Sequence, residues 1–544
     1  MGLKIIKYDK MIIFKANQLL TTMSYPSIFN DVLGPVMRGP SSSHCAASLR
    51  IGRICYDLMG GIISHIEIDF DPNGSLATTH KEQGSDMGLF GGFLGWEADD
   101  ERLVHSEQHI GIAGIRVNIN IKDIQAEHPN TYQITLQSPR EQHQVIAIST
   151  GGGMIEVIEI DGAALSHAGD AFLTLIYTSN PESVKHYLEQ VPKIDSIEFK
   201  KGDQSYCLVR SQALLEKTLL QDIKAMDEVS IVKEIRPVLP VLTAKDQKVP
   251  FITCEEMLAY NEDKNLSLWK LAVRYESIRG NITEEEVLSK MRHIYGFMRN
   301  AVDTGLKGTQ FEDRILGPQS VTFKERMESK KMVDASVLNK IIMYVSAIME
   351  VKSSMGVIVA APTAGSCGAM PGAVLGVADA LDLPEEEAVK ALMVAGLIGV
   401  FIAAHSTFAA EVGGCQAECG SGSCMAAAAI VGLAGGNLYQ SLSAASMALQ
   451  SSLGMICDPI GNRVEAPCLN KNVMAASNAL SCANMALADY DHLIPLDEVI
   501  ETMYAVGKSI PNTLRCTNLG GLSITKTAKE IEKRLERKQF FKSC

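Results

Sequence analysis

Cysteine residues are concentrated in the last third of the chain, where their thiols are spaced closely enough to bind a metal ion or a cluster. Nine of the 13 cysteines lie at or after Cys367. Cys415, Cys419 and Cys424 fall within EVGGCQAECGSGSC, and Cys457 and Cys468 flank a Pro/Gly-rich loop. Converging thiolates would suit zinc or an iron-sulfur cluster, and spacing does not choose between them. The alternative is that small cysteines pack among Ala and Gly, which suits Cys419 and Cys424 best.

Hydroxyl groups and an imidazole follow a Gly-Pro turn near the start of the chain. Ser41, Ser42, Ser43 and His44 lie on a loop that leads into a helical pattern. Such a loop could bind a substrate carboxylate, and His44 could act as a base because imidazole titrates near neutrality. A plain helix N-cap by one serine is the alternative.

The elements that must position these groups begin with an α/β domain over residues 23–146. We expect a helix over 49–59, a strand in HIEIDFD, and a hairpin formed by IRVNINIKDI and TYQITLQS. A second unit over 147–227 has a β-α-β-β order, which resembles the ACT-type regulatory fold. The triple glycine Gly151–Gly153 predicts a hairpin bend there. Three prolines and mixed charges then predict a linker over 228–250.

From residue 251 to 544 the pattern is helical, and we expect an all-α domain. A Thr-x-x-Glu capping signal precedes EEEVLSKMRHIYGFMRNAVDTGL. The segment 357–488 is rich in Ala, Gly, Met and Ser, which allows close helix packing around a buried centre. The apolar run from Ala391 to Ala404 is shorter than the roughly 18 to 20 residues that span a bilayer. It predicts a buried helix.

Composition narrows the class of protein. The 544 residues carry a formal net charge of -13, with 46% hydrophobic and 21% charged residues. This predicts a folded, multidomain protein that binds neither nucleic acid nor anionic membranes. The N-terminal stretch lacks a signal-peptide pattern, so we expect a cytoplasmic protein.

Several motifs occur together in the order seen in iron-sulfur-dependent L-serine dehydratases. They are GPVMRGPSSSHCAASLRIGR, APTAGSCGAMPG, EVGGCQAE, CDPIGNRVEAPC and LNKN, and the chain resembles the fused, single-chain form of that family. The resemblance implies a small-molecule amino-acid substrate, L-serine, and a 4Fe-4S cluster held by Cys415, Cys457 and Cys468. Three thiolates leave one iron open for Lewis-acid catalysis, and no pyridoxal phosphate is needed. Pyruvate and ammonia are the expected products.

The resemblance also implies roles for further residues. Some family members carry a terminal cysteine that caps the open iron, so we hypothesise that Cys544 is a displaceable fourth ligand. Thr363 and Ser366 could bind substrate oxygen atoms, and Asn472 could support the carboxylate or only cap a loop.

Three positions depart from the family pattern. Gln83 stands where a histidine is usual, so the catalytic base is open among His44, His80 and Lys81. Lys81, Ser75 and Asp86 hold family positions, and Ser75 and Asp86 are expected to bind the substrate. Ala364 replaces an asparagine, and Cys516 replaces a glutamate. Alternatives are therefore the same chemistry on L-threonine, L-cysteine or another β-substituted acid, or an amino-acid sensor without turnover. We expect a homodimer, because ACT-like units often pair.

Overall fold

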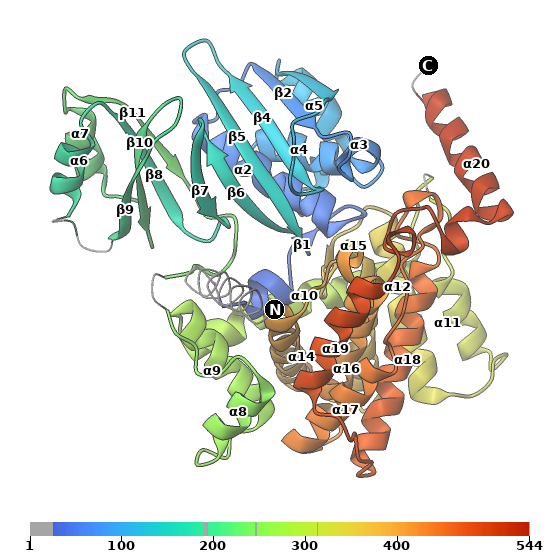
Figure 1. Cartoon of the computed structure of the whole chain (residues 1–544). Coiled ribbons are helices and arrows are strands. Elements are labelled where there is room, and N and C mark those ends of the chain that lie inside the picture. The colour runs from blue at the N-terminus through green and yellow to red at the C-terminus, as the bar shows by residue number, and fades with distance from the viewer. Residues whose placement is uncertain (1–24, 190, 192–193, 245–246, 313, 543–544) are drawn as a thin grey trace, which may run out of the picture.

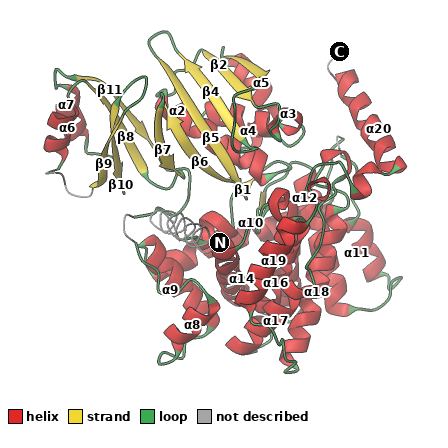
Figure 2. Ribbon diagram, viewed as in Figure 1, coloured by secondary structure: helices red, strands yellow, loops and turns green. Residues whose placement is uncertain are grey.

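The computed structural model describes residues 25–189, 191, 194–244, 247–312 and 314–542. Sheets occupy the N-terminal part and helices the C-terminal part, as Figures 1 and 2 show. The predicted multidomain class, with an α/β N-terminal domain and a helical C-terminal region, is confirmed.

The first sheet has six strands in the order β3-β2-β4-β5-β6-β7. Only β2 and β3 are parallel among its neighbouring pairs. The predicted strand in HIEIDFD is β2, but the predicted hairpin is wrong, because β2 lies between its two arms, β3 and β4. The reason is burial: Ile66, Ile68 and Phe70 of β2 are fully buried, whereas β3 is largely exposed and takes the edge. The strands are β2 His65–Phe70, β3 Arg116–Ile121, β4 Thr131–Gln137, β5 Gln142–Gly151, β6 Met154–Ile160 and β7 Ala163–His167.

Helices pack against one face of this sheet (Figure 1). The predicted helix over 49–59 is α2, Ala47–Leu58, and it crosses α4, Ser85–Phe93, at glycines. A Cβ on Gly92 would lie 2.7 Å from the Cα of Gly52, so the two helices touch backbone to backbone. Two shorter helices, α3 Leu76–Thr79 and α5 Ser106–Ile112, complete this layer.

The second sheet has the order β11-β8-β10-β9 within a β-α-β-β-α-β unit. The predicted β-α-β-β run is present as β8, α6, β9 and β10, and the ACT-like assignment stays a prediction. The expected division at 147 falls inside β5, which pairs with β6 around Gly151–Gly153, so the first sheet extends further. The expected linker begins with β11, whose consecutive residues 231–235 pair antiparallel with β8. The elements are β8 Phe172–Thr178, α6 Pro181–Leu188, β9 Ile194–Lys200, β10 Tyr206–Ser211, α7 Lys217–Lys224 and β11 Val229–Ile235.

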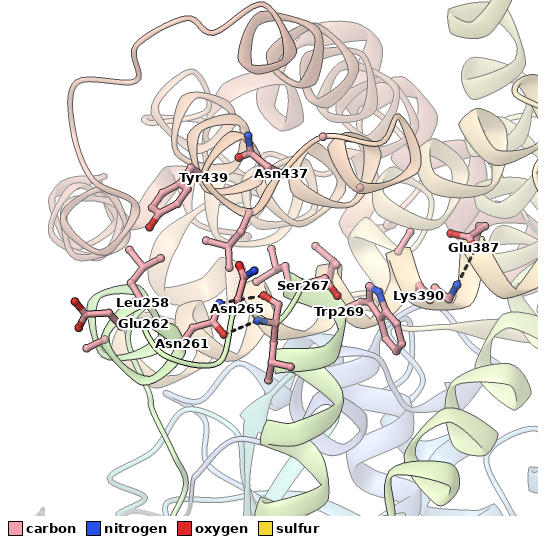
Figure 3. A pocket seen from close by; sticks show the side chains of 18 residues that line it. Leu258, Asn261, Glu262, Asn265, Ser267, Trp269, Glu387, Lys390, Asn437 and Tyr439 are labelled. Carbon is pink, nitrogen blue, oxygen red and sulfur yellow. Dashed lines mark hydrogen bonds and ion pairs between the residues drawn. The ribbon is translucent and has the colours of Figure 1, made fainter.

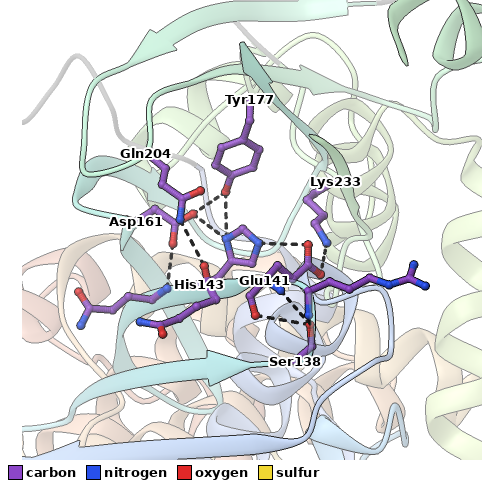
Figure 4. A network of polar contacts seen from close by, with 10 residues as sticks. Ser138, Glu141, His143, Asp161, Tyr177, Gln204 and Lys233 are labelled. Atoms are coloured by element: carbon purple, nitrogen blue, oxygen red, sulfur yellow. Dashed lines mark hydrogen bonds and ion pairs between the residues drawn. The ribbon is translucent and has the colours of Figure 1, made fainter. Parts of the chain in front are cut away.

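A buried polar network joins the two sheets (Figure 4). Tyr177 of β8 donates a hydrogen bond of 2.6 Å to Asp161, which lies 2.7 Å from Nδ1 of His143 on β5. Lys233 of β11 contacts Glu141 at 2.5 Å. Because charges buried in this way must keep their partners, the network fixes how one sheet sits on the other.

Helices form the rest of the chain, apart from a two-stranded ladder of β1, Val36–Met37, and β12, Ile358–Val359. The predicted capping box is present at Thr283 and Glu286. The predicted buried helix lies within α14, which is long and apolar enough to cross a membrane but has 78% of its apolar window buried in the protein. The helices are α8 Cys254–Asn261, α9 Leu268–Gly280, α10 Glu284–Lys307, α11 Ser320–Glu328, α12 Ser336–Ser353, α13 Ala369–Ala380, α14 Glu385–His405, α15 Ala410–Gly413, α16 Ser421–Leu433, α17 Leu438–Gln450, α18 Cys468–Leu487, α19 Leu496–Ser509 and α20 Lys526–Lys542.

The N-terminal segment before the first sheet is built into the helical domain. Its short π-helix η1, Ile28–Val32, packs against α14, where a Cβ on Gly396 would meet Ile28. The buried carboxylate of Glu276 on α9 accepts hydrogen bonds from the Ser27 hydroxyl at 2.5 Å and the Ile28 amide at 2.8 Å. The two parts of the chain therefore share one core.

Candidate active site

A narrow pocket of about 30 Å³ lies where the N-terminal domain meets the helical domain. Its lining brings together segments that are more than 300 residues apart in the sequence, and it includes both the predicted serines and two of the predicted cysteine ligands. Polar and thiol groups on its wall come from Ser41, Ser42, Ser43, Gln83, Thr363, Glu411, Glu418, Cys457, Cys468 and Cys516.

The serine loop places three hydroxyls at the pocket and its histidine behind them. Ser41 and Ser43 lie 3.1 and 3.3 Å from Nδ1 of His44, on the π-helix η2, Ser42–Ala46. Nε2 of His44 lies 3.1 Å from the Thr79 hydroxyl, and burial lowers the pKa of His44 to about 4. His44 does not line the pocket, and its Nδ1 contacts two of the serine hydroxyls that do.

The segment 75–86, which contains the predicted bases His80 and Lys81, lies beside the pocket. Of its residues, only Gln83 lines the pocket. His80 contacts Asp86 at 2.7 Å, and this hydrogen bond raises the pKa of His80. Ser75 donates a hydrogen bond to Asn130, and Lys81 is exposed. None of these four side chains lines the pocket, whereas Gln83 does and is 4% exposed.

The thiols form a second wall. Cys415 precedes the π-helix η5, Gln416–Gly420, while Cys457 lies in the loop after α17 and Cys468 begins α18. Cys415 and Cys457 share a small apolar cluster with Cys419, against which Cys516 packs. A hydrogen bond from Cys457 to Cys516 raises the pKa of Cys457 well above its usual range, and burial adds to the shift. Burial also raises the pKa of Cys468.

The predicted donor set consists of thiols, which suit an iron-sulfur cluster or zinc. In the described part of the chain, no three His, Cys, Asp or Glu side chains surround a point where one ion would bind. A cluster instead binds each thiolate to a different iron. Cys415, Cys457 and Cys468 come from three separate segments of the chain, and Cys415 lies close enough to contribute to the raised pKa of both Cys457 and Cys468. Cys544 lies outside the described residues.

Asn472 and the glycine-rich loop support the thiol wall. Asn472 Oδ1 accepts a hydrogen bond of 2.9 Å from the Ala369 amide, and its Nδ2 donates 2.8 Å bonds to the carbonyls of Gly365 and Cys468. The buried side chain therefore ties the loop to the start of α18. Ser366 is fully buried and caps its own turn with Thr363, so it does not face the pocket.

Two glutamates that the sequence analysis did not single out line the pocket. Glu418 Oε1 accepts a 2.7 Å hydrogen bond from Thr363. Burial raises the pKa of Glu418 to about 7, although the Thr363 hydrogen bond acts in the opposite direction. Burial also raises the pKa of Glu411. Both residues stand within or beside the EVGGCQAE motif, but sequence gives no sign of which carboxylates are desolvated. A group with a pKa near neutrality suits general-base catalysis.

A larger groove of about 840 Å³ lies elsewhere, between α8, α9, α14 and α17 (Figure 3). Trp269, Lys390, Asn437 and Tyr439 are on its wall. It contains none of the predicted site residues and no cysteine, so the chemistry points to the smaller pocket.

The chain is similar in sequence to known proteins, and the family match lies in its helical domain. Residues 263–523 match the family described as serine dehydratase alpha chain. A probable L-serine dehydratase alpha chain from Bacillus subtilis is 37% identical over 52% of this chain and 95% of its own length. L-serine dehydratase 1 from Escherichia coli is 31% identical over 51% of this chain and 62% of its own. An L-serine dehydratase from Helicobacter pylori strain J99 is 26% identical over 90% of this chain and 96% of its own.

Proposed function

Because the chain belongs to the L-serine dehydratase family, we propose that it converts L-serine to pyruvate and ammonia with an iron-sulfur cluster. The observation that carries the proposal is the pocket in which hydroxyls from the first domain face thiols from the second. Cys457 and Cys468 line this pocket, and Cys415 packs in one cluster with Cys457. Full-length similarity to a single-chain relative supports the participation of both domains.

The reaction removes the α-proton and expels the β-hydroxyl of serine as water. The aminoacrylate product then tautomerises and is hydrolysed to pyruvate and ammonia. When bound by Cys415, Cys457 and Cys468, the cluster would supply a Lewis acid that assists the loss of the hydroxyl. This chemistry needs no pyridoxal phosphate.

The chain's own residues have distinct roles in the proposal. The hydroxyls of Ser41, Ser42 and Ser43 bind the substrate carboxylate, and His44 orients two of them. Glu418 takes the α-proton, because it is the pocket carboxylate whose pKa lies near 7. The hydroxyl of Thr363 donates a hydrogen bond to one of its oxygens and so fixes its position. Gln83 donates a hydrogen bond to the substrate but cannot accept the proton as a base.

A second candidate keeps the chemistry and changes the substrate. Gln83 lines the pocket, and the fully buried Ala364 lies between two residues that line it, Thr363 and Gly365. Both positions depart from the pattern of the family that the sequence resembles. These two positions favour a test of L-threonine and L-cysteine beside L-serine. Comparing kcat/KM for the three amino acids identifies the preferred substrate.

The direct test is anaerobic purification followed by iron and acid-labile sulfide analysis, with pyruvate release from L-serine assayed on the same sample. About four irons and four sulfides, as in a 4Fe-4S cluster, together with pyruvate are expected. Zinc without iron would overturn the cysteine assignment. A full cluster that releases pyruvate from neither L-serine nor L-cysteine, and no 2-oxobutyrate from L-threonine, would favour a sensor.

We further propose that the enzyme works as a homodimer in the cytoplasm. The clustered free thiols of the described chain suit a reducing compartment, and the second sheet offers a unit that could pair. Light scattering after size-exclusion chromatography measures the oligomeric state, and a monomer at all concentrations would contradict the dimer.

A further inference from the structure

A second cavity, of about 370 Å³, adjoins the candidate active pocket. It lies between the hairpin of β5 and β6 in the first sheet and the segment that follows α14 in the helical domain. Gly152, Phe408 and Ala409 line both this cavity and the active pocket. The two spaces therefore meet at these three residues, which we call the neck, and we call the larger cavity the outer chamber.

The outer chamber leads from solvent to the neck. Thr150 and Ser166 on its wall are exposed, whereas Gly152 at its inner end is buried and Phe408 is only 8% exposed. The active pocket has a volume of about 30 Å³, and its serine hydroxyls belong to buried residues. A substrate must therefore pass through the protein to reach these hydroxyls, and the chamber offers space on that path.

The hairpin tip that forms one side of the neck is held in place. Arg50 donates a hydrogen bond to the Gly153 carbonyl, and a Cβ on Gly153 would lie 2.9 Å from Pro35. Across the neck, a Cβ on Gly151 would lie 3.3 Å from the Cβ of Ala409. One side of the neck is thus fixed backbone without side chains.

The wall of the outer chamber is acidic. Asp31 and Glu156 line it, and no Lys, Arg or His of the described residues does. The chamber also lies at the carboxyl end of α14, where the helix dipole is negative. The Ser406 hydroxyl is buried there and has no hydrogen-bond partner among the described residues. These groups favour a ligand that carries an ammonium group.

We propose that the outer chamber is the entrance through which an amino-acid substrate reaches the active pocket, and that Phe408 limits the size of what passes the neck. Phe408 has the largest side chain of the three neck residues. The inference rests on the proposed function for the identity of the substrate, whereas the route itself does not require the cluster. The entrance lies between the two domains, on the side of the β5–β6 hairpin.

The route can be tested without turnover, by the reaction of the pocket thiols with small reagents. The cluster-free full chain is treated anaerobically with aminoethyl methanethiosulfonate, which is a cation, and separately with the anionic sulfonatoethyl reagent. Mass spectrometry gives the rate of modification at Cys457 and Cys468, which are buried and line the active pocket. Each rate then reports how fast a small charged molecule reaches the pocket.

Four variants alter the route and its charge, and a fifth is a matched control. S166W fills the mouth of the chamber, and S166A removes only the hydroxyl that donates to Glu156. F408A widens the neck, and E156Q removes one charge. A164W is the control, because Ala164 is exposed on the same strand, β7, but does not line the chamber.

We expect S166W to slow the modification of both thiols several-fold with either reagent, and F408A to speed it. S166A and A164W should match the parent protein in S166W's assay. E156Q should lower the ratio of the cationic to the anionic rate about twofold, the effect of removing one charge at roughly 8 Å in water. Equal rates in S166W and the parent protein, or equal slowing by A164W, would overturn the proposed entrance. An unchanged rate in F408A would overturn the role of Phe408, and an unchanged ratio in E156Q that of the charge.

Kinetics of the iron-loaded enzyme connect the entrance to the substrate. S166W should raise the KM for L-serine several-fold and leave kcat unchanged, because the groups in the active pocket are intact. A parent enzyme that releases no pyruvate would defeat the proposed function, while slower thiol modification in S166W would still support the entrance.

Discussion

At the scale of single residues, the pocket combines hydroxyls, thiols and two carboxylates within a small volume. Glu418 is the residue on which the proposed chemistry depends most, because it is the proposed acceptor of the α-proton. Its position is fixed by Thr363, which donates to one of its oxygens at 2.7 Å. The charge state of this one side chain therefore links pH to rate.

Replacing Glu418 with Gln removes the proposed base while keeping the shape of the side chain. We expect E418Q to lower kcat about 10²- to 10⁴-fold, the usual contribution of a general base. The rise in kcat/KM of the parent enzyme through a pH of about 7 should also disappear, because the base must be deprotonated to work. The measurement is pyruvate release from L-serine across pH, with iron content checked in each sample.

E411Q is the matched control, since Glu411 lines the same pocket and carries the same charge. If E411Q lowers kcat as much as expected for E418Q, and E418Q remains active, the base is Glu411.

Glu418 should also make stability depend on pH. Its pKa is raised from 4.5 to about 7 in the folded protein, so the folded state binds the proton more tightly. The favourable contribution is complete below pH 4.5 and is lost as the pH rises through about 7. The loss amounts to at most about 3 kcal/mol. In cluster-free protein at pH 8, E418Q should therefore have a higher Tm than the parent, and the difference should vanish near pH 4.5. A Tm difference independent of pH would contradict the assignment.

At the scale of elements, the crossing of α2 and α4 sets the distance between the serine loop and Gln83. α2 follows η2 directly, and α4 begins two residues after Gln83. The helices meet at Gly52 and Gly92, where a side chain on either would strike the backbone of the other. The glycines therefore matter for their lack of a Cβ, and not for backbone freedom.

G92A should destabilise the protein by about 1–3 kcal/mol, because overpacking forces two backbones apart. It should also raise the KM for L-serine, since the serine loop and Gln83 move relative to each other. Urea unfolding and steady-state kinetics measure the two effects. G111A is the control: Gly111 is also helical, but a Cβ there meets no atom within 4 Å. Equal urea-unfolding midpoints for G92A and the parent protein would show that α2 and α4 can shift to accommodate the added methyl group.

At the scale of the whole molecule, the two parts of the chain depend on each other. Residues Ile28, Phe29 and Val32 belong to the same apolar core as the helices of the C-terminal region. The pocket takes residues from both parts. Neither part alone contains the complete site.

The chain cut between residues 250 and 251 should therefore reassemble. We expect the two fragments, produced together, to purify as one complex with pyruvate-forming activity, and each fragment alone to have none. The reason is the shared core, which buries Ile28 and Val32 only when both fragments are present. Co-purification through a tag on one fragment, followed by the activity assay, measures this. Full activity of fragment 251–544 alone would contradict the two-domain site.

The sequence by itself determined much of the local structure and the identity of the thiols. Period-two alternation located β2, β8, β9 and β10, and the capping signal located the start of α10, because these patterns reflect short-range geometry. Motif order indicated the family and predicted Ser41–Ser43, Cys457 and Cys468 as site residues, and these residues line one pocket in the structure. Each of these features is contained in a few neighbouring residues.

The tertiary structure alone decided which groups meet. Strand pairing placed β2 between the arms of the expected hairpin, and domain packing brought the serine loop to the thiols. Burial raises the pKa of Glu418 and lowers that of His44, which does not line the pocket. A backbone bridge between Cys457 and Arg515 places Cys516 beside Cys457. These outcomes depend on desolvation and on contacts between segments far apart in the chain, and a linear pattern carries no record of either.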